Sequence, residues 1–184
     1  MAKDRTRWAT IDTSPLCSLE HLGLFRPLTF LFDRIYIPRR VQTEYRVKRN
    51  SRTRLASVCE ELAPYERCNE ADEISIRLLL DEIRSTSQRL SRSRRHEGEA
   101  EAIIQAIQIG APTVIVDEKT ARKWALERNL QCRGTLWILE QLRERNLIGP
   151  LQPMLSILDK RGIRLPRTEV QQLLAKLDES TEVG

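Results

Sequence analysis

Short apolar runs alternate along the chain with longer stretches in which apolar residues recur at helical spacing. This alternation is typical of an α/β fold, in which helices cover both faces of a central parallel sheet of about four to five strands. The strand-like runs lie at residues 8–12, 34–38, 112–117 and about 130–133. Helices are expected at residues 14–21, 27–32, 39–49, 55–63, 70–90, 98–109, 118–128, 135–145, 151–161 and 168–178.

Residues at the ends of these stretches support the predicted boundaries. Gly23 and Gly110 follow helical stretches, at positions where glycine commonly ends a helix. We expect Ser14 to cap the first helix, because a serine hydroxyl accepts a hydrogen bond from a free backbone N–H. Thr168 and Gln171 have the spacing of a capping box, which predicts the start of the last helix.

Composition excludes several classes of protein. Of the 184 residues, 40% are hydrophobic and 31% charged, which is ordinary for a soluble globular protein, and no apolar run approaches the ~18 residues that span a membrane. The first residues are polar and lack the apolar core of a secretory signal. The four cysteines are irregularly spaced and there are only two histidines, so no zinc pattern is present. We expect reduced thiols and a cytoplasmic protein.

The net charge of +5 is unevenly distributed. Residues 39–54 hold seven Arg or Lys against one Glu, and residues 84–95 hold five Arg and no acid. Residues 60–73, between them, carry six acids against one Arg. Such basic runs are typical either of a solvated helix face or of a surface that binds the phosphates of a nucleic acid. Aromatic residues make up only 5% of the chain, which does not favour a base-stacking platform.

Carboxylates recur where predicted strands end and helices begin. Asp12 and Asp117 end two predicted strands, Glu44 lies in the helix after the second strand, and Glu99 and Glu101 lie in the first turns of another helix. Singly, each acid is explained as a helix cap or as a favourable charge near a helix N-terminus. Together they suit an enzyme that cleaves phosphodiesters, because carboxylates from separate elements then hold Mg²⁺ or Mn²⁺.

In their order and setting, five segments resemble those of PIN-domain nucleases, over about residues 8–175. The resemblance is to the PIN-like branch that carries a GEAEAI segment. The segments are IDTSPL (11–16), IPRRVQTEY (37–45), GEAEAIIQA (98–106), TVIVDEKTARKWA (113–125) and RGTLWILEQL (133–142). The resemblance implies a three-layer PIN-like fold and a metal-dependent endoribonuclease that leaves 3′-hydroxyl and 5′-phosphate ends. It also implies a toxin of a toxin–antitoxin pair.

The resemblance assigns roles to individual residues. Asp12 matches the first acid, Glu44 the second and Asp117 the last. Glu101 matches the third acid best. Glu99 is the supporting or alternative acid, because residues two positions apart on a helix point about 160° away from each other and cannot face the metal in the same way. The hydroxyl of Ser14 matches one near the metal. Backbone phosphates of RNA are expected to meet five arginines: Arg39, Arg40, Arg92, Arg94 and Arg95.

These inferences define one PIN-like domain over residues 1–178, with a basic helical insertion at about 46–96 and a frayed tail at 179–184. RNA is the expected substrate, and a protein antitoxin and a second copy of the chain are the expected partners. The apolar stripes of the last two helices provide either a dimer interface or ordinary core packing. Two alternatives remain open: a non-catalytic module that binds nucleic acid or protein, and a DNA-directed nuclease of the same chemistry.

Overall fold

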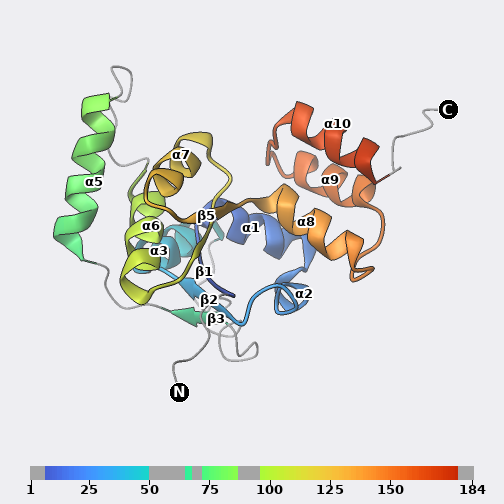
Figure 1. Cartoon of the computed structure of the whole chain (residues 1–184). Coiled ribbons are helices and arrows are strands. Elements are labelled where there is room, and N and C mark those ends of the chain that lie inside the picture. Colours follow the sequence, from blue (N-terminus) through green and yellow to red (C-terminus); the bar gives the residue numbers. More distant parts are fainter. Residues whose placement is uncertain (1–6, 50–64, 68–71, 87–95, 178–184) are drawn as a thin grey trace.

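Five strands among the described residues form one parallel sheet, in the order β3-β2-β1-β4-β5 (Figure 1). The computed structural model describes residues 7–49, 65–67, 72–86 and 96–177. The central strand β1 pairs with β2 on one side and with β4 on the other, so that Ala9 lies opposite both Ile35 and Thr113. The strands are β1 (Trp8–Ile11), β2 (Arg34–Ile37), β3 (Tyr65–Arg67), β4 (Thr113–Ile115) and β5 (Gln131–Arg133).

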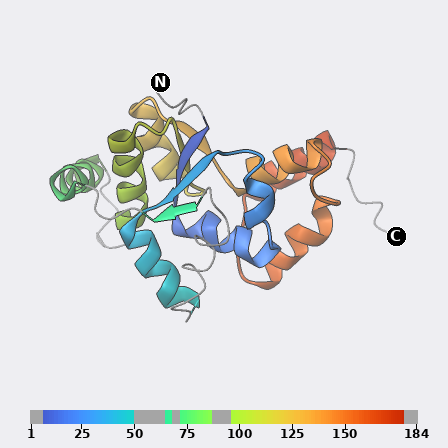
Figure 2. The same ribbon diagram turned by 90° about the horizontal axis from the view of Figure 1, so that it is seen from below.

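Helices cover both faces of this sheet (Figures 1 and 2). On one face, α5, α6 and α7 form a core with Val114, and the Thr10 hydroxyl donates to the carbonyl of Ala102 at 2.8 Å. On the other face, Ala9 and Ile11 pack with α1, α2, α3 and α8, and α9 and α10 lie outside α1 and α8. The bounds are α1 (Thr13–Leu22), α2 (Phe25–Leu28), α3 (Arg39–Arg49), α5 (Glu73–Thr86), α6 (Glu97–Ile109), α7 (Lys119–Glu127), α8 (Thr135–Glu144), α9 (Leu151–Lys160) and α10 (Arg167–Lys176).

The predicted α/β fold with three layers is confirmed, and so are most of the expected elements. Gly23 and Gly110 end α1 and α6 with φ values of 69° and 68°, the left-handed conformation that glycine adopts without strain. Strand β3 was not predicted, because three residues with the sequence YER carry no apolar pattern. The helix expected at 55–63 and the tail at 179–184 lie outside the described residues.

Two of the predicted helix caps are wrong. Helix α1 begins at Thr13 and its cap is Asp12, whose Oδ2 accepts a hydrogen bond from the backbone N–H of Ser14 at 3.3 Å. Helix α10 begins at Arg167 after Pro166, so Thr168 already lies inside the helix and forms no capping box. Proline fixes a φ value compatible with a helix start, which makes a side-chain cap dispensable there.

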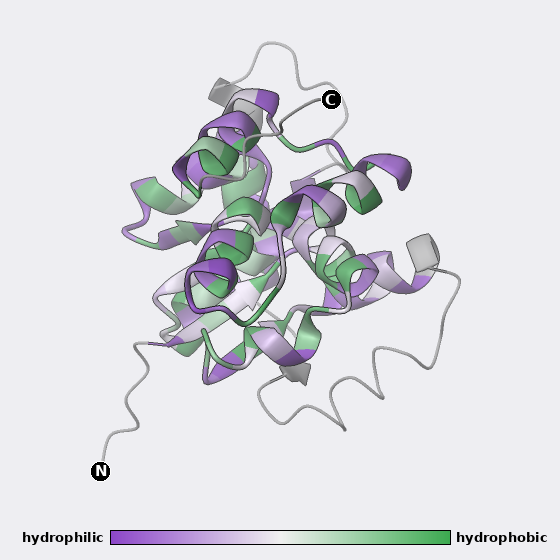
Figure 3. Ribbon diagram, turned by 90° about the vertical axis from the view of Figure 1, so that its right-hand side faces the viewer, coloured by the Kyte–Doolittle hydropathy of each residue, from purple (hydrophilic) through white to green (hydrophobic). Residues whose placement is uncertain are grey.

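The C-terminal helices cover the core with their apolar faces. Leu173 belongs to the core cluster that contains Ala9 and Ile11, and Leu155, Val170 and Leu174 pack against this cluster. Leu158 is also buried, whereas Ile157 is exposed. Hydrophobic and hydrophilic residues accordingly form separate stripes along individual helices (Figure 3). Of the helices in the described part of the chain, none combines the length and apolar character needed to cross a membrane.

Candidate functional site

The order of the strands places a crevice at the carboxyl end of β1. After β1, the chain adds β2 and β3 on one side and then returns to add β4 and β5 on the other. Such a reversal leaves room between the connections that follow the two central strands, and α/β proteins bind ligands there. Asp12 directly follows β1, and Asp117 follows β4 by two residues.

Asp12 is held in place by both of its neighbouring elements. Its backbone N–H donates to the carbonyl of Ile115 at 3.0 Å, which extends the pairing of β1 with β4 by one residue. Its side chain caps α1 and is only 5% exposed. The cap therefore orients this carboxylate at the end of the sheet.

Glu44 of α3 lies beside Asp12, and Gly98 of α6 lies against both. The hydroxyl of Thr13 donates to Glu44 Oε2 at 2.8 Å. A Cβ atom on Gly98 would lie 3.0 Å from Glu44 Oε1 and 3.2 Å from Asp12 Oδ1. The absence of a side chain at Gly98 thus lets the first turn of α6 approach two carboxylates that come from different elements.

Glu99 completes this group of acids. Burial of the side chain and the nearby negative charge of Asp12 raise the pKa of Glu99 to about 8, with smaller contributions from Glu44 and Glu118. The raised pKa reflects like charges held close together in a poorly solvated place. Asp12, Glu44 and Glu99 are called the acid group below.

The crowding in the acid group predicts a pH dependence of stability. The pKa of a glutamate in an unfolded chain is about 4.3, so the folded protein, in which the Glu99 pKa is about 8, binds more protons between these values. The free energy of unfolding should therefore fall as the pH rises from about 5 to about 8. Thermal unfolding in a chelating buffer should show this decline in the wild type and a smaller decline in Glu99→Gln. Parallel profiles for the two proteins would contradict the crowding.

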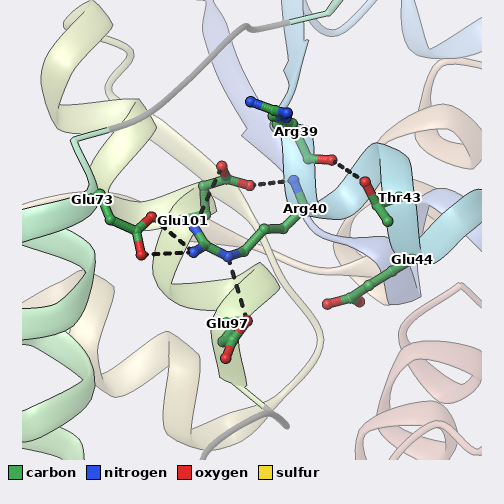
Figure 4. A pocket seen from close by; sticks show the side chains of 7 residues that line it. All are labelled: Arg39, Arg40, Thr43, Glu44, Glu73, Glu97 and Glu101. Carbon is green, nitrogen blue, oxygen red and sulfur yellow. Dashed lines mark hydrogen bonds and ion pairs between the residues drawn. The ribbon is translucent and has the colours of Figure 1, made fainter.

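Glu101 points toward Arg40 of α3 (Figure 4). Its Oε2 accepts the backbone N–H of Arg40 at 2.6 Å, and its Oε1 lies 3.8 Å from the Arg40 guanidinium. The same guanidinium binds Glu73 of α5 at 2.8 Å and Glu97 at 3.4 Å. The structure thus places Glu99, and not Glu101, beside Asp12, although Glu101 is the more deeply buried of the two.

Both carboxylate oxygens of Asp117 bind Thr135, and the charges that act most on Asp117 are those of Arg122 and Glu169, which lie outside the acid group. Oδ1 accepts the backbone N–H of Thr135 and Oδ2 accepts its hydroxyl, each at 2.7 Å. Burial raises the pKa of Asp117, and these two hydrogen bonds partly oppose that rise. The next residue, Glu118, caps α7 by accepting the N–H of Ala121 at 2.7 Å. Asp117 thus ties β4 to the start of α8.

Removal of the Asp117 carboxylate should destabilise the protein. Asp117→Ala loses two hydrogen bonds made by a charged acceptor, and we expect the free energy of unfolding to fall by about 2–3 kcal/mol in urea titrations. Thr135→Val removes only the hydroxyl and should cause a smaller loss. The double variant should lose less than the sum of the two single variants, because both act on one interaction. Wild-type stability of Asp117→Ala would contradict this role.

The predicted RNA-binding arginines have different surroundings. Arg40 is surrounded by Glu73, Glu97 and Glu101, so much of its charge is neutralised within the protein. Arg39 is exposed, and its guanidinium lies farther from these acids than that of Arg40, although its charge still acts on Glu101 (Figure 4). Arg92, Arg94 and Arg95 lie outside the described residues. Arg39 and Arg40 both line a pocket of about 470 Å³. Its other lining residues are Thr43, Glu44, Glu73, Glu97 and Glu101.

Sequence reasoning missed two residues of the site. It assigned a hydroxyl near the acids to Ser14, but Ser14 is exposed and supplies its backbone N–H to Asp12, and the hydroxyl that bonds an acid belongs to Thr13. It also gave no role to Gly98. A glycine inside a helix lowers stability by about 1 kcal/mol relative to alanine, which indicates a close approach at that position.

Within the described ranges, no three His, Cys, Asp or Glu side chains already surround a point where a metal ion would sit. The acid group nevertheless has the chemistry of a divalent-cation site. Its donors are carboxylate oxygens, the ligands that Mg²⁺ and Mn²⁺ prefer. A cation would offset the repulsion that raises the pKa of Glu99. The long side chain of Glu99 has the rotatable bonds needed to turn toward one.

Comparison with known proteins agrees with the fold. A family model described as a PIN domain matches residues 8–179 of the chain. PIN domains are in general nucleases and typically use divalent metal ions. A search of curated proteins finds no significant match. Because the matched region includes all five strands and every residue of the acid group, the chain belongs to the PIN-domain family.

Proposed function

We propose that this protein is a metal-dependent endoribonuclease in which Asp12, Glu44 and Glu99 hold Mg²⁺ or Mn²⁺. The observation that carries the proposal is the convergence of these three carboxylates, from the end of β1, from α3 and from α6, around Gly98. Three carboxylates crowded into a poorly solvated place destabilise the fold. Such destabilising clusters of charge are common at functional sites, where the charges are needed for activity. The family membership supports nuclease chemistry.

The residues of this chain have distinct tasks in the proposed reaction. A bound Mg²⁺ or Mn²⁺ supplies Lewis-acid activation of the phosphodiester and of the attacking water. Asp12 and Glu44 are fixed before substrate arrives, the first by its role as a helix cap and the second by the Thr13 hydroxyl. Hydrolysis breaks the bond between phosphorus and the 3′-oxygen and leaves 3′-hydroxyl and 5′-phosphate ends. Glu101 and Asp117 act from a distance, by orienting α3 and α8.

Exposed Arg39 supports binding of the substrate backbone beside the acid group. Glu44, a member of that group, and Arg39 line the same pocket. A phosphate near Arg39 therefore places the neighbouring phosphodiester close to the carboxylates, since phosphate contacts position a nucleic acid without reading its sequence. A net charge of +5 adds general attraction for a polyanion.

The test is cleavage of an end-labelled single-stranded RNA, with a DNA of the same sequence as comparison, at one stated salt concentration. The proposal predicts internal cuts in the RNA with Mn²⁺ or Mg²⁺, none with a chelator, and little cutting of the DNA. Equal cutting of both would assign a DNA-directed or unselective nuclease. Binding without cutting by the metal-loaded protein would assign a non-catalytic module instead.

We extend the proposal to a toxin role, with a protein antitoxin that blocks the acid group. Expression in a bacterial host should then arrest growth, and Asp12→Asn should remove the arrest. Cleavage of RNA in vitro without any growth defect would overturn the toxin role while leaving the nuclease activity in place.

A further inference from the structure

His96 is a largely buried histidine whose ring nitrogens lack hydrogen-bond partners in the described part of the chain. It directly precedes α6, and its side chain is only 12% exposed. Both Nδ1 and Nε2 are buried, and neither makes a hydrogen bond. The ring meets Trp124 edge to face, with 5.4 Å between centroids. Burial of a polar group without a partner costs about 1–3 kcal/mol, so its retention calls for an explanation.

The group that His96 faces is Glu99. Nδ1 of His96 lies 3.8 Å from Glu99 Oε1, one helical turn farther along α6. This distance is too long for a hydrogen bond but falls within the range of an ion pair. A small rotation of either side chain would bring an N–H into contact with the carboxylate. The imidazole therefore stands beside the one glutamate of this helix turn that belongs to the acid group.

The other glutamates of the turn have a different partner. Glu97 and Glu101 are four residues apart, so they share a face of α6, and Arg40 binds both. Glu99 lies on another face, and the neighbouring charges that act on it are those of the other acids. His96 is therefore placed so that its imidazole can hold the Glu99 carboxylate in one orientation.

We propose that His96 positions Glu99, by donating its Nδ1–H to Oε1 when Glu99 binds a divalent cation. The inference rests on the proposed function, since it assumes a cation at the acid group. Carboxylate ligands are commonly held by a hydrogen bond from a second residue, and loss of such a partner lowers metal affinity about 10–100-fold. This role also explains why a buried imidazole is retained without a partner in the absence of the cation.

The chain offers a clean spectroscopic test, because His21 and His96 are its only histidines. Mg²⁺ alone is added to the wild type at fixed pH, and the ring resonances of both histidines are followed by NMR. The proposal predicts that the His96 resonances shift with saturation and that the His21 resonances do not. Mg²⁺ binding without any change at His96 would overturn it, whatever the activity of the protein.

Two variants separate positioning from packing. His96→Asn places an amide N–H near the position of Nδ1, whereas His96→Leu fills the space beside Trp124 without a donor. We expect Mg²⁺ affinity to fall about 10–100-fold in His96→Leu, to recover in part in His96→Asn, and to stay unchanged in the control His21→Ala. Equal Mg²⁺ affinity of His96→Leu and the wild type would overturn the positioning role of His96 but not the proposed function. Failure of the wild type to bind Mg²⁺ or Mn²⁺ would overturn the proposed function as well.

Discussion

Replacement of Asp12 by asparagine should lower the rate of Mn²⁺-dependent RNA cleavage by about 100-fold or more. Loss of a residue that merely supports a metal ligand already costs 10–100-fold, so loss of a ligand should cost at least as much. The fold should survive, because the asparagine side-chain oxygen can still accept the N–H of Ser14 and cap α1. Removal of one of three crowded charges should also leave the melting temperature unchanged or raise it.

Asp159→Asn is the matched control for Asp12→Asn, because Asp159 is an exposed aspartate near the end of α9. Cleavage of labelled RNA and thermal unfolding are measured for both variants and the wild type. Asp159→Asn should keep wild-type activity. Undiminished cleavage by Asp12→Asn would remove Asp12 from the metal site, and loss of folding in this variant would contradict the expected retention of the cap.

Glu99→Gln and Glu101→Gln should have opposite effects, although the two residues are only two apart on α6. Glu99→Gln should reduce cleavage as severely as Asp12→Asn and should stabilise the fold, since it removes a charge that the other acids disfavour. Glu101→Gln should retain most of the activity but lose about 1–2 kcal/mol of stability. Its charged bonds to the backbone and guanidinium of Arg40 are weakened.

The pair of glutamine variants serves as its own control, because the chemical change is the same and the helix is the same. Rates of RNA cleavage and urea unfolding curves give both quantities for each protein. An inactive Glu101→Gln together with an active Glu99→Gln would support the ranking from the sequence, in which Glu101 is the third metal ligand and Glu99 the alternative. It would also contradict the orientation of α6 described above.

The sequence predicted most elements of the fold well, because they depend on local patterns. Alternating apolar runs indicated the parallel sheet, with Asp12 at the end of its first strand and Glu44 in the helix that follows the second strand. The choice between Glu99 and Glu101 depends instead on how α6 is rotated about its axis. That rotation is set by packing of Ala100 and Ile103 against the core, which the spacing of acids does not reveal.

Contacts between side chains that lie far apart in the sequence could not be predicted from it either. The basic run at 39–54 was compatible with a solvated helix face or a phosphate-binding surface, but it did not predict that Arg40 binds acids of α5 and α6 more than thirty residues away. The two bonds from Thr135 to Asp117, eighteen residues apart in the chain, were likewise not predicted. Charge runs describe composition, and only the folded chain determines which charges meet.

Calorimetric titration of Mn²⁺ into the wild type and Asp12→Asn, at one pH and one salt concentration, tests the central claim most directly. The claim is that Asp12, Glu44 and Glu99 together hold a divalent cation. We predict saturable binding in the wild type and its loss in Asp12→Asn, although both proteins remain folded by circular dichroism. The claim would be contradicted by a wild type that binds no Mn²⁺, or by Asp12→Asn that binds Mn²⁺ as tightly as the wild type.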